Sequence, residues 1–445
     1  MRYVPFYVGR GDDTKASEIV TSGMAIYFIV ALTIFALSMV LAGPIARFYE
    51  GGREFVALVR ILGLAAAVEC PILIFDASLR AQERWIAANA VVVVSEITRA
   101  VGLAGCIYFG YGLVQMGYVV LFVKALNLAI IAIVFFRLCP KFQMGASMVK
   151  WSQIRALLFF GVLTVVATMA SSLWIQGHKL IVGKIVSLEA VTVYAVAAML
   201  IDRVRRIVWA PLQVSWPRFA LLDGASQREE VTRFFTRTTR YGVILASGII
   251  LFVLTAGPTF IRLWVRRESM EAAFPVLMTL GLGCLISSSL FVNESFLGAS
   301  GHQRARALFA SIEGILGITM SILLGLRMGM LGVAAGYMIA VIMVRGLVCS
   351  RYVCHLLEIR LVGYYAQCLL RPWLITGMTA AIIYYSGIPS YVHNWPSLIL
   401  FGILVGCVYT ATIFIVVMDP EEKLKIVGIM RKLFTRASFA ADSKN

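Results

Sequence analysis

Long apolar runs joined by short polar connections constrain this chain more than any other feature of its sequence. A bilayer core about 30 Å thick is crossed by roughly 20 helical residues, and many segments of the chain reach that length. They lie at about 20–42, 55–78, 86–110, 113–137, 154–176, 190–213, 241–264, 273–297, 305–326, 331–354, 366–387 and 396–418. The sequence therefore predicts an all-α polytopic membrane protein with about twelve transmembrane helices.

The composition excludes several classes of soluble protein. Of the 445 residues, 60% are hydrophobic and 14% are charged, whereas soluble domains are roughly 45–50% apolar and about 25% charged. The longest polar connection, near 214–240, is too short for a catalytic or nucleotide-binding domain. Four scattered histidines and eight cysteines without CxxC spacing give no metal-site pattern. We expect no enzyme, no catalytic residues, no cofactor and no nucleic-acid partner.

The distribution of basic residues predicts the orientation in the membrane. The net charge is +17, and most of the Lys and Arg residues in connections fall on one side if both termini are placed in the cytoplasm. This is the asymmetry of the positive-inside rule. One outer connection, with Arg262, Arg266 and Arg267, departs from it.

An internal repeat is visible in short matched patterns. Gly43-Pro44 matches Gly257-Pro258, Leu62-Gly63-Leu64 matches Leu280-Gly281-Leu282, Asp76 matches Glu294, and Gly117-Tyr118 matches Gly336-Tyr337. An even number of helices separates the copies, so the repeat is parallel. The predicted parts are an N-terminal lobe of four helices (1–137), a C-terminal lobe of six (150–357), a final helix pair (363–418) and a cytoplasmic tail (419–445).

The lobes differ in length because 154–176 and 190–213 precede the second copy. Either a four-helix unit carries an inserted pair, or a six-helix unit lacks its first pair. We favour the second alternative, since 1–18 occupies the same repeat position as 216–231.

The stretch 157–202 resembles the seventh and eighth helices of oligosaccharide flippases. These form the polysaccharide-transport branch of the multidrug/oligosaccharidyl-lipid/polysaccharide (MOP) exporter superfamily. The resemblance rests on Phe160-Gly161, Lys179 with Lys184, the run 193–197 and Trp216-Pro217. It implies a two-lobe bundle of fourteen helices, of which the first two are missing here through a misassigned start, a split gene or a real truncation. His178 replaces an acidic residue frequent in the family, which puts a borrowed cation-coupling role at this position in doubt.

Basic residues within the spans are the candidate substrate-binding residues, because charge inside a membrane marks function by default. The set is Arg203, Arg205, Arg206, Arg99, Lys124, Lys179 and Arg345. Asp202 lies four residues before Arg206, so these two are expected to pair, which leaves two guanidiniums to bind phosphate. The alternatives are arginines that snorkel to the headgroups and, for Arg99, a structural pair with Glu96.

Acidic residues within the spans are the candidate ion-coupling residues. Asp76 and Glu294 occupy equivalent repeat positions, and Glu96 lies on a helix between them. A protonatable acid can couple ion flow to the movement of two lobes. The alternative is that these acids neutralise nearby arginines.

The resemblance implies a flippase that moves polyprenyl-diphosphate-linked oligosaccharide, for O-antigen, capsule or exopolysaccharide, across the bacterial inner membrane. Its partners would be this lipid-linked substrate, membrane lipids, and the polysaccharide polymerase and export machinery. The alternatives are a drug/cation antiporter of the same superfamily, a membrane-embedded glycosyltransferase or polymerase, and an inactive truncated chain.

Overall fold

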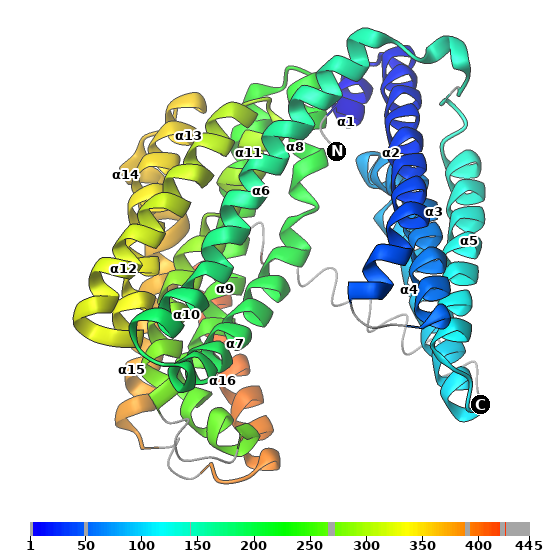
Figure 1. Cartoon of the computed structure of the whole chain (residues 1–445). Coiled ribbons are helices and arrows are strands. Elements are labelled where there is room, and N and C mark those ends of the chain that lie inside the picture. The colour runs from blue at the N-terminus through cyan, green and yellow to red at the C-terminus, as the bar shows by residue number, and fades with distance from the viewer. Residues whose placement is uncertain are drawn as a thin grey trace, which may run out of the picture. The chain divides into compact units, whose positions relative to one another are not determined.

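The computed structural model describes residues 3–48, 52–142, 144–265, 272–387, 392–418 and 423. In these ranges the regular structure is helical throughout (Figure 1). The predicted all-α class is therefore confirmed. The predicted cytoplasmic tail (419–445), Arg266 and Arg267 lie outside the described residues, apart from Lys423.

The first repeat and the pair of helices after it comprise seven α-helices. They are α1 (Tyr3–Gly9), α2 (Asp13–Phe48), α3 (Arg53–Ala81), α4 (Trp85–Tyr108), α5 (Leu113–Leu138), α6 (Trp151–Ile185) and α7 (Leu188–Leu212). The second repeat and the final pair follow. Their elements are α8 (Ser215–Gly224), α9 (Arg228–Val265), α10 (Ala273–Ser289), α11 (Phe291–Ala299), α12 (Gln303–Val341), the π-helix η3 (Ile342–Cys349), α13 (Ser350–Leu356), α14 (Leu361–Tyr364), the π-helix η4 (Tyr365–Leu370), α15 (Arg371–Tyr385) and α16 (Trp395–Val416).

Ten helical stretches in the described residues are long and apolar enough to cross a membrane. One of them, Gln303–Leu356, is 54 residues long and is broken at Gly329, whose φ of 60° and ψ of −139° are not helical. It therefore contains two of the predicted spans. The predicted span 190–213 corresponds to α7, which is not among the ten; it carries Asp202 and three arginines. When Gln303–Leu356 is counted as two spans and α7 is added, the ten stretches correspond to the twelve segments expected from the sequence.

The order of helices repeats along the chain. A short helix precedes a long one in both copies, α1 before α2 and α8 before α9, and each long helix has a proline near its end, Pro44 and Pro258. Asp12 lies just before α2, where the backbone N–H of Lys15 donates to its Oδ1 at 3.0 Å. That hydrogen bond lowers the pKa of the Asp12 carboxyl below its usual value.

The described chain divides into two compact units. The first unit is drawn from Met1–Val166, Gln213–Val231 and Ser295–Ala307, and the second from Ala167–Leu212, Thr232–Glu294 and Leu308–Asn445. The first unit has a core of Val20, Phe75, Leu79 and Phe135 from α2, α3 and α5. The four-helix and six-helix lobes predicted from the sequence stay a prediction.

The second unit has a core built where α9 packs on the final helices. Leu251 of α9, Ile383 of α15, and Phe401 and Tyr409 of α16 are buried together. The Tyr409 hydroxyl also donates to the carbonyl of Ile244 at 3.0 Å. Polar and apolar contacts thus fix α16 against α9.

Candidate functional site

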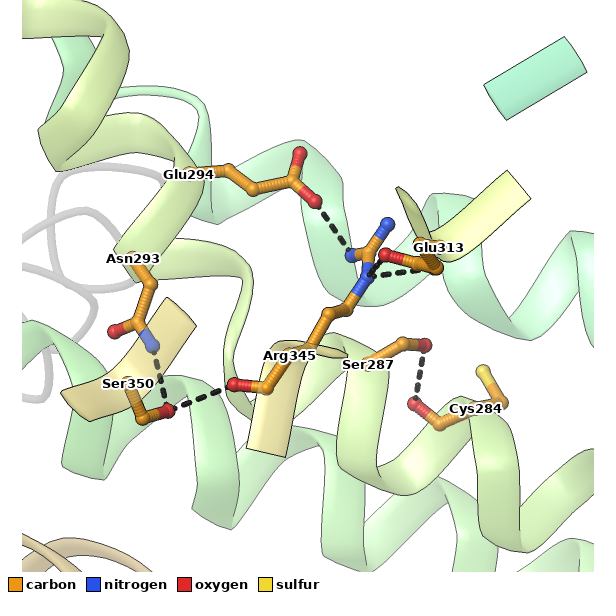
Figure 2. Close-up of polar contacts among 7 residues, drawn as sticks. All are labelled: Cys284, Ser287, Asn293, Glu294, Glu313, Arg345 and Ser350. Carbon is orange, nitrogen blue, oxygen red and sulfur yellow. Dashed lines mark hydrogen bonds and ion pairs between the residues drawn. The ribbon is translucent and has the colours of Figure 1, made fainter. Parts of the chain in front are cut away.

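Arg345 lies between two carboxylates in the interior of the second unit (Figure 2). Its Nε donates to Glu313 Oε2 at 2.7 Å and to Oε1 at 3.0 Å. Its Nη1 lies 2.7 Å from Glu294 Oε1. Arg345 belongs to η3, Glu313 to α12 and Glu294 to α11, so three separate elements supply the cluster. We call Glu294, Glu313 and Arg345 the triad.

The wide turns of η3 are held by hydrogen bonds around the backbone of Arg345. The Ser350 hydroxyl donates to the Arg345 carbonyl at 2.9 Å and accepts from Asn293 Nδ2 at 3.0 Å. Asn293 Oδ1 accepts in turn from the Tyr364 hydroxyl at 3.1 Å. Single π-turns within helices occur frequently at functional sites. Here the π-helix and its partners fix the place of Arg345.

The triad has an excess of negative charge when all three groups are ionised. Glu313 is 3% exposed and Arg345 is 8% exposed, whereas the Glu294 side chain is 25% exposed. One guanidinium balances one of the two carboxylates, and an uncompensated charge away from water is costly. The second carboxylate can offset that cost by binding a proton or a small cation, and Glu294 is the more accessible of the two.

A second charged group lies on α7 of the same unit. Asp202 pairs with Arg205, rather than with Arg206, the partner expected from the four-residue spacing. Ile201 and Val208 are buried, and Arg205 lies on their face of the helix. Its guanidinium lies over Trp209, with 5.3 Å between the Cζ atom and the ring centroid. Arg205 lies on the buried face of α7, so Asp202 pairs with Arg205 and not with the exposed Arg206.

Arg203 and Arg206 are exposed on α7. Neither has an ion pair among the described residues. They are three positions apart, so their side chains leave the helix on neighbouring parts of its surface. Two guanidiniums that have no acidic partner can bind one anionic group together.

A buried aromatic cluster adjoins these charges. His178 of α6 packs edge-on against Tyr337 of α12, with 5.8 Å between ring centroids, and Tyr194 of α7 lies 6.5 Å from His178. Arg205 also interacts electrostatically with Tyr337. Lys179, the next residue on α6, is half-buried. The position where the family often has an acid is thus occupied by a buried histidine among tyrosines.

The candidate residues of the first unit form pairs of their own. Lys124 of α5 lies 2.7 Å from Glu69 Oε1 of α3. Asp76 accepts from Arg80 Nε at 2.7 Å. These contacts give Lys124 and Asp76 local partners of opposite charge, as the structural alternative predicts for Asp76.

Glu96 and Arg99 pair with each other along α4, and both side chains remain exposed. Among the residues that the structure describes, neither side chain forms an ion pair with a third residue. Two alternatives were predicted for Arg99, a structural pair with Glu96 and a contact with substrate. The observed ion pair is the structural one.

A family model describing polysaccharide biosynthesis proteins matches residues 10–268. The match covers more than half of the chain. The chain belongs to the polysaccharide biosynthesis protein family. A comparison with curated proteins finds no match.

Solved structures show that this polysaccharide biosynthesis family member has the MOP transporter fold. An outward-facing multidrug resistance MATE transporter of the MOP superfamily superposes with a TM-score of 0.68 at 14% identity, over 80% of this chain and 82% of the other. A mutant of the MATE transporter VcmN from Vibrio cholerae gives 0.70 at 13% identity, over 82% and 84%.

A third structure is a MOP superfamily transporter from Pyrococcus furiosus, described by the reverse polarity of its binding pocket and a suggested different function. It gives a TM-score of 0.65 at 13% identity, over 86% of this chain and 82% of the other. The sequence match thus shows the family, and the solved structures show the fold.

The sequence did not single out Glu313, which the structure places in the triad. Glu313 and Arg345 are 32 positions apart, on helices joined by the break at Gly329, and they meet because the chain reverses there. The sequence already separated the spans 305–326 and 331–354, but it does not state which side chains of the two helices meet.

Proposed function

We propose that this protein translocates an oligosaccharide linked through diphosphate to a polyprenyl lipid across the bacterial inner membrane by alternating access. Membership of a polysaccharide biosynthesis family and the MOP fold support transport of a glycan intermediate. The observation that carries the proposal is the exposed pair Arg203 and Arg206 on α7, which lacks an acidic partner among the described residues.

The chemistry of the pair suits a diphosphate. A guanidinium stays charged when water is removed, and its planar fork can hold two phosphate oxygens at once. Two such groups three residues apart match the two phosphates of the linkage. The glycan would cross the membrane with the diphosphate while the polyprenyl tail stays in the lipid. In this proposal Lys179 is a further contact, whereas Arg99, Lys124 and Arg345 act through their acidic partners.

The triad is the proposed ion-coupling site. Glu294 would take up a proton or cation in one state and release it in the other, while Arg345 stays bound to Glu313. This assigns coupling to Glu294 among the three predicted acids, because Asp76 and Glu96 each have a basic neighbour on their own helix. We further propose cytoplasmic termini and delivery of the product to a polymerase and export machinery.

The test is a strain that lacks the gene, in which lipid-linked glycan and surface polysaccharide are measured together. We expect accumulation of polyprenyl-diphosphate oligosaccharide with loss of the surface glycan. The double variant Arg203→Gln/Arg206→Gln should restore surface glycan at least tenfold less well than the unmodified protein at equal expression. Arg371→Gln, which removes an exposed arginine from the start of α15, is the matched control and should restore it fully. Full rescue by the double variant would contradict the proposed site.

A drug/cation antiporter is the second candidate. The excess of carboxylate in the triad favours it, since a cationic drug needs an acidic site. An antiporter predicts an unchanged amount of lipid-linked glycan, intact surface polysaccharide and increased drug sensitivity in the same deletion strain. That outcome would replace the flippase proposal.

A further inference from the structure

The two short helices α1 and α8 meet in a reciprocal contact. A Cβ added at Gly9 would overlap the carbonyl oxygen of Leu221, and one added at Gly224 would overlap the carbonyl oxygen of Phe6. Phe6 and Leu221 are separated by the same number of residues as Gly9 and Gly224. The glycine of each helix therefore contacts the backbone of the other helix at the equivalent repeat position, as in a two-fold symmetric interface.

The equivalence continues into the turns after the helices. Gly11 has a φ of 73° and Ser226, at the same repeat position, has a φ of 58°. Two residues beyond each lies the first residue of a long helix, Asp13 of α2 and Arg228 of α9. Left-handed backbone is unusual for serine. Its presence indicates that the same helix–turn–helix geometry is imposed on both repeats.

The position of α8 in the chain makes this contact mechanically important. α8 belongs to the first unit together with α1, whereas α9 passes into the second unit from Thr232 onward. Only Ala225, Ser226 and Gln227 separate the two helices. α8 is thus a short part of the second repeat that belongs to the first unit, and the contact at Gly9 and Gly224 joins it to α1.

We propose that α1 and α8 form a clamp between the two repeats that is closed in this conformation and opens during transport, and that Gly9 and Gly224 are the residues that let it close. The inference rests on transport by alternating access and does not depend on the cargo. Because the two backbones meet with no side chains between them, the contact is lost when α1 and α8 separate. In this proposal, separation of α8 from α1 opens the end of the protein at which they meet.

The test uses the full-length protein with spin labels at Thr14→Cys and Glu229→Cys. These exposed positions are equivalent in the two repeats and lie at the starts of α2 and α9. Cys407, the exposed native cysteine, is replaced by Ser, and the other seven cysteines are buried. Distances between the labels are measured by double electron–electron resonance in nanodiscs without substrate. We expect a short and a long population in the unmodified background.

Alanine at either glycine should remove the short population and lower transport at least tenfold. Gly43→Ala and Gly161→Ala are matched controls, because a Cβ at either position meets nothing within 4 Å, and they should change neither quantity. Monodispersity in size-exclusion chromatography and an unchanged content of helix show that each variant is folded.

The clamp is overturned if folded Gly9→Ala and Gly224→Ala variants keep the short population, or if the background shows one distance only. The proposed function fails separately. Two populations that respond to both alanines, in a protein that moves no lipid-linked glycan, would leave the clamp in place and remove the cargo assignment.

Discussion

The charge balance of the triad in the second unit depends on one buried guanidinium. Arg345 contacts both Glu294 and Glu313, and it is the only cation in the triad. Removing one partner of a buried ion pair costs about 3–5 kcal/mol, because the other charge is left uncompensated. The stability of this region therefore depends on Arg345 more than on either carboxylate alone.

We expect Arg345→Gln to lower the free energy of unfolding by about 3 kcal/mol, because Glu313 then keeps a buried charge without a partner. The double variant Arg345→Gln/Glu313→Gln should recover more than half of that loss, since the uncompensated charge is gone. Reversible unfolding in mixed detergent micelles measures both values. Equal losses in the single and double variants would contradict the pairing.

Glu294 differs from Glu313 in its exposure, and the difference gives a separate prediction. Glu294→Gln should abolish the dependence of transport on the ion gradient while leaving the protein folded, because the side chain is a quarter exposed and an amide has nearly the size of the carboxylate and an oxygen that can accept a hydrogen bond. Uptake into proteoliposomes with and without a gradient measures the effect. Asp76→Asn is the control at the equivalent repeat position, and an equal effect there would contradict the assignment to Glu294.

At the scale of elements, one glycine marks the reversal between two spans that the apolar pattern already separated, 305–326 and 331–354. Gly329 has a φ of 60° and a ψ of −139°, a region of backbone space that is essentially restricted to glycine. The chain reverses there, and a Cβ at nearby Gly332 or Gly336 would meet the backbone of Leu324 or Ser321. The hairpin that brings Glu313 to Arg345 therefore depends on small residues.

Gly329→Ala should lower the free energy of unfolding by about 1–3 kcal/mol through backbone strain. Gly161→Ala, in the middle of α6 with open space around its Cβ, should be neutral or stabilise by up to about 1 kcal/mol. Thermal unfolding followed by circular dichroism compares the two variants. The prediction fails if the alanine at 329 is tolerated as well as the one at 161.

The sequence predicted the positions of most helices, but it did not predict which side chains of different helices pair. The predicted spans 113–137 and 396–418 correspond to Leu113–Leu138 and Trp395–Val416, because apolar length alone marks a helix that crosses lipid. The division of 273–297 into α10 and α11 and the π-helix at Arg345 were not predicted, since neither changes the hydrophobic pattern. The pairs Lys124–Glu69 and Arg345–Glu313 depend on which helices are neighbours, which a single sequence does not state.

For the whole molecule, the charge asymmetry predicts which ends of the helices share a side of the membrane. Cysteines at Thr14 and Glu229 should react with an impermeant maleimide from the cytoplasmic side, because basic residues concentrate in those connections. A cysteine at Tyr111, in the short connection between α4 and α5, should react from the opposite side. Labelling of intact spheroplasts and inverted vesicles distinguishes them, and labelling of all three from one side would refute the predicted orientation.

The charges of α7 have a consequence for how the chain is made. Arg or Asp at the centre of a membrane helix costs about 2.5–3.5 kcal/mol in translocon insertion, and α7 carries Asp202, Arg203, Arg205 and Arg206. The apolar residues of this helix do not offset such a cost on their own. We therefore expect α7 to enter the membrane together with a neighbouring helix rather than alone, with Asp202 and Arg205 already paired within α7.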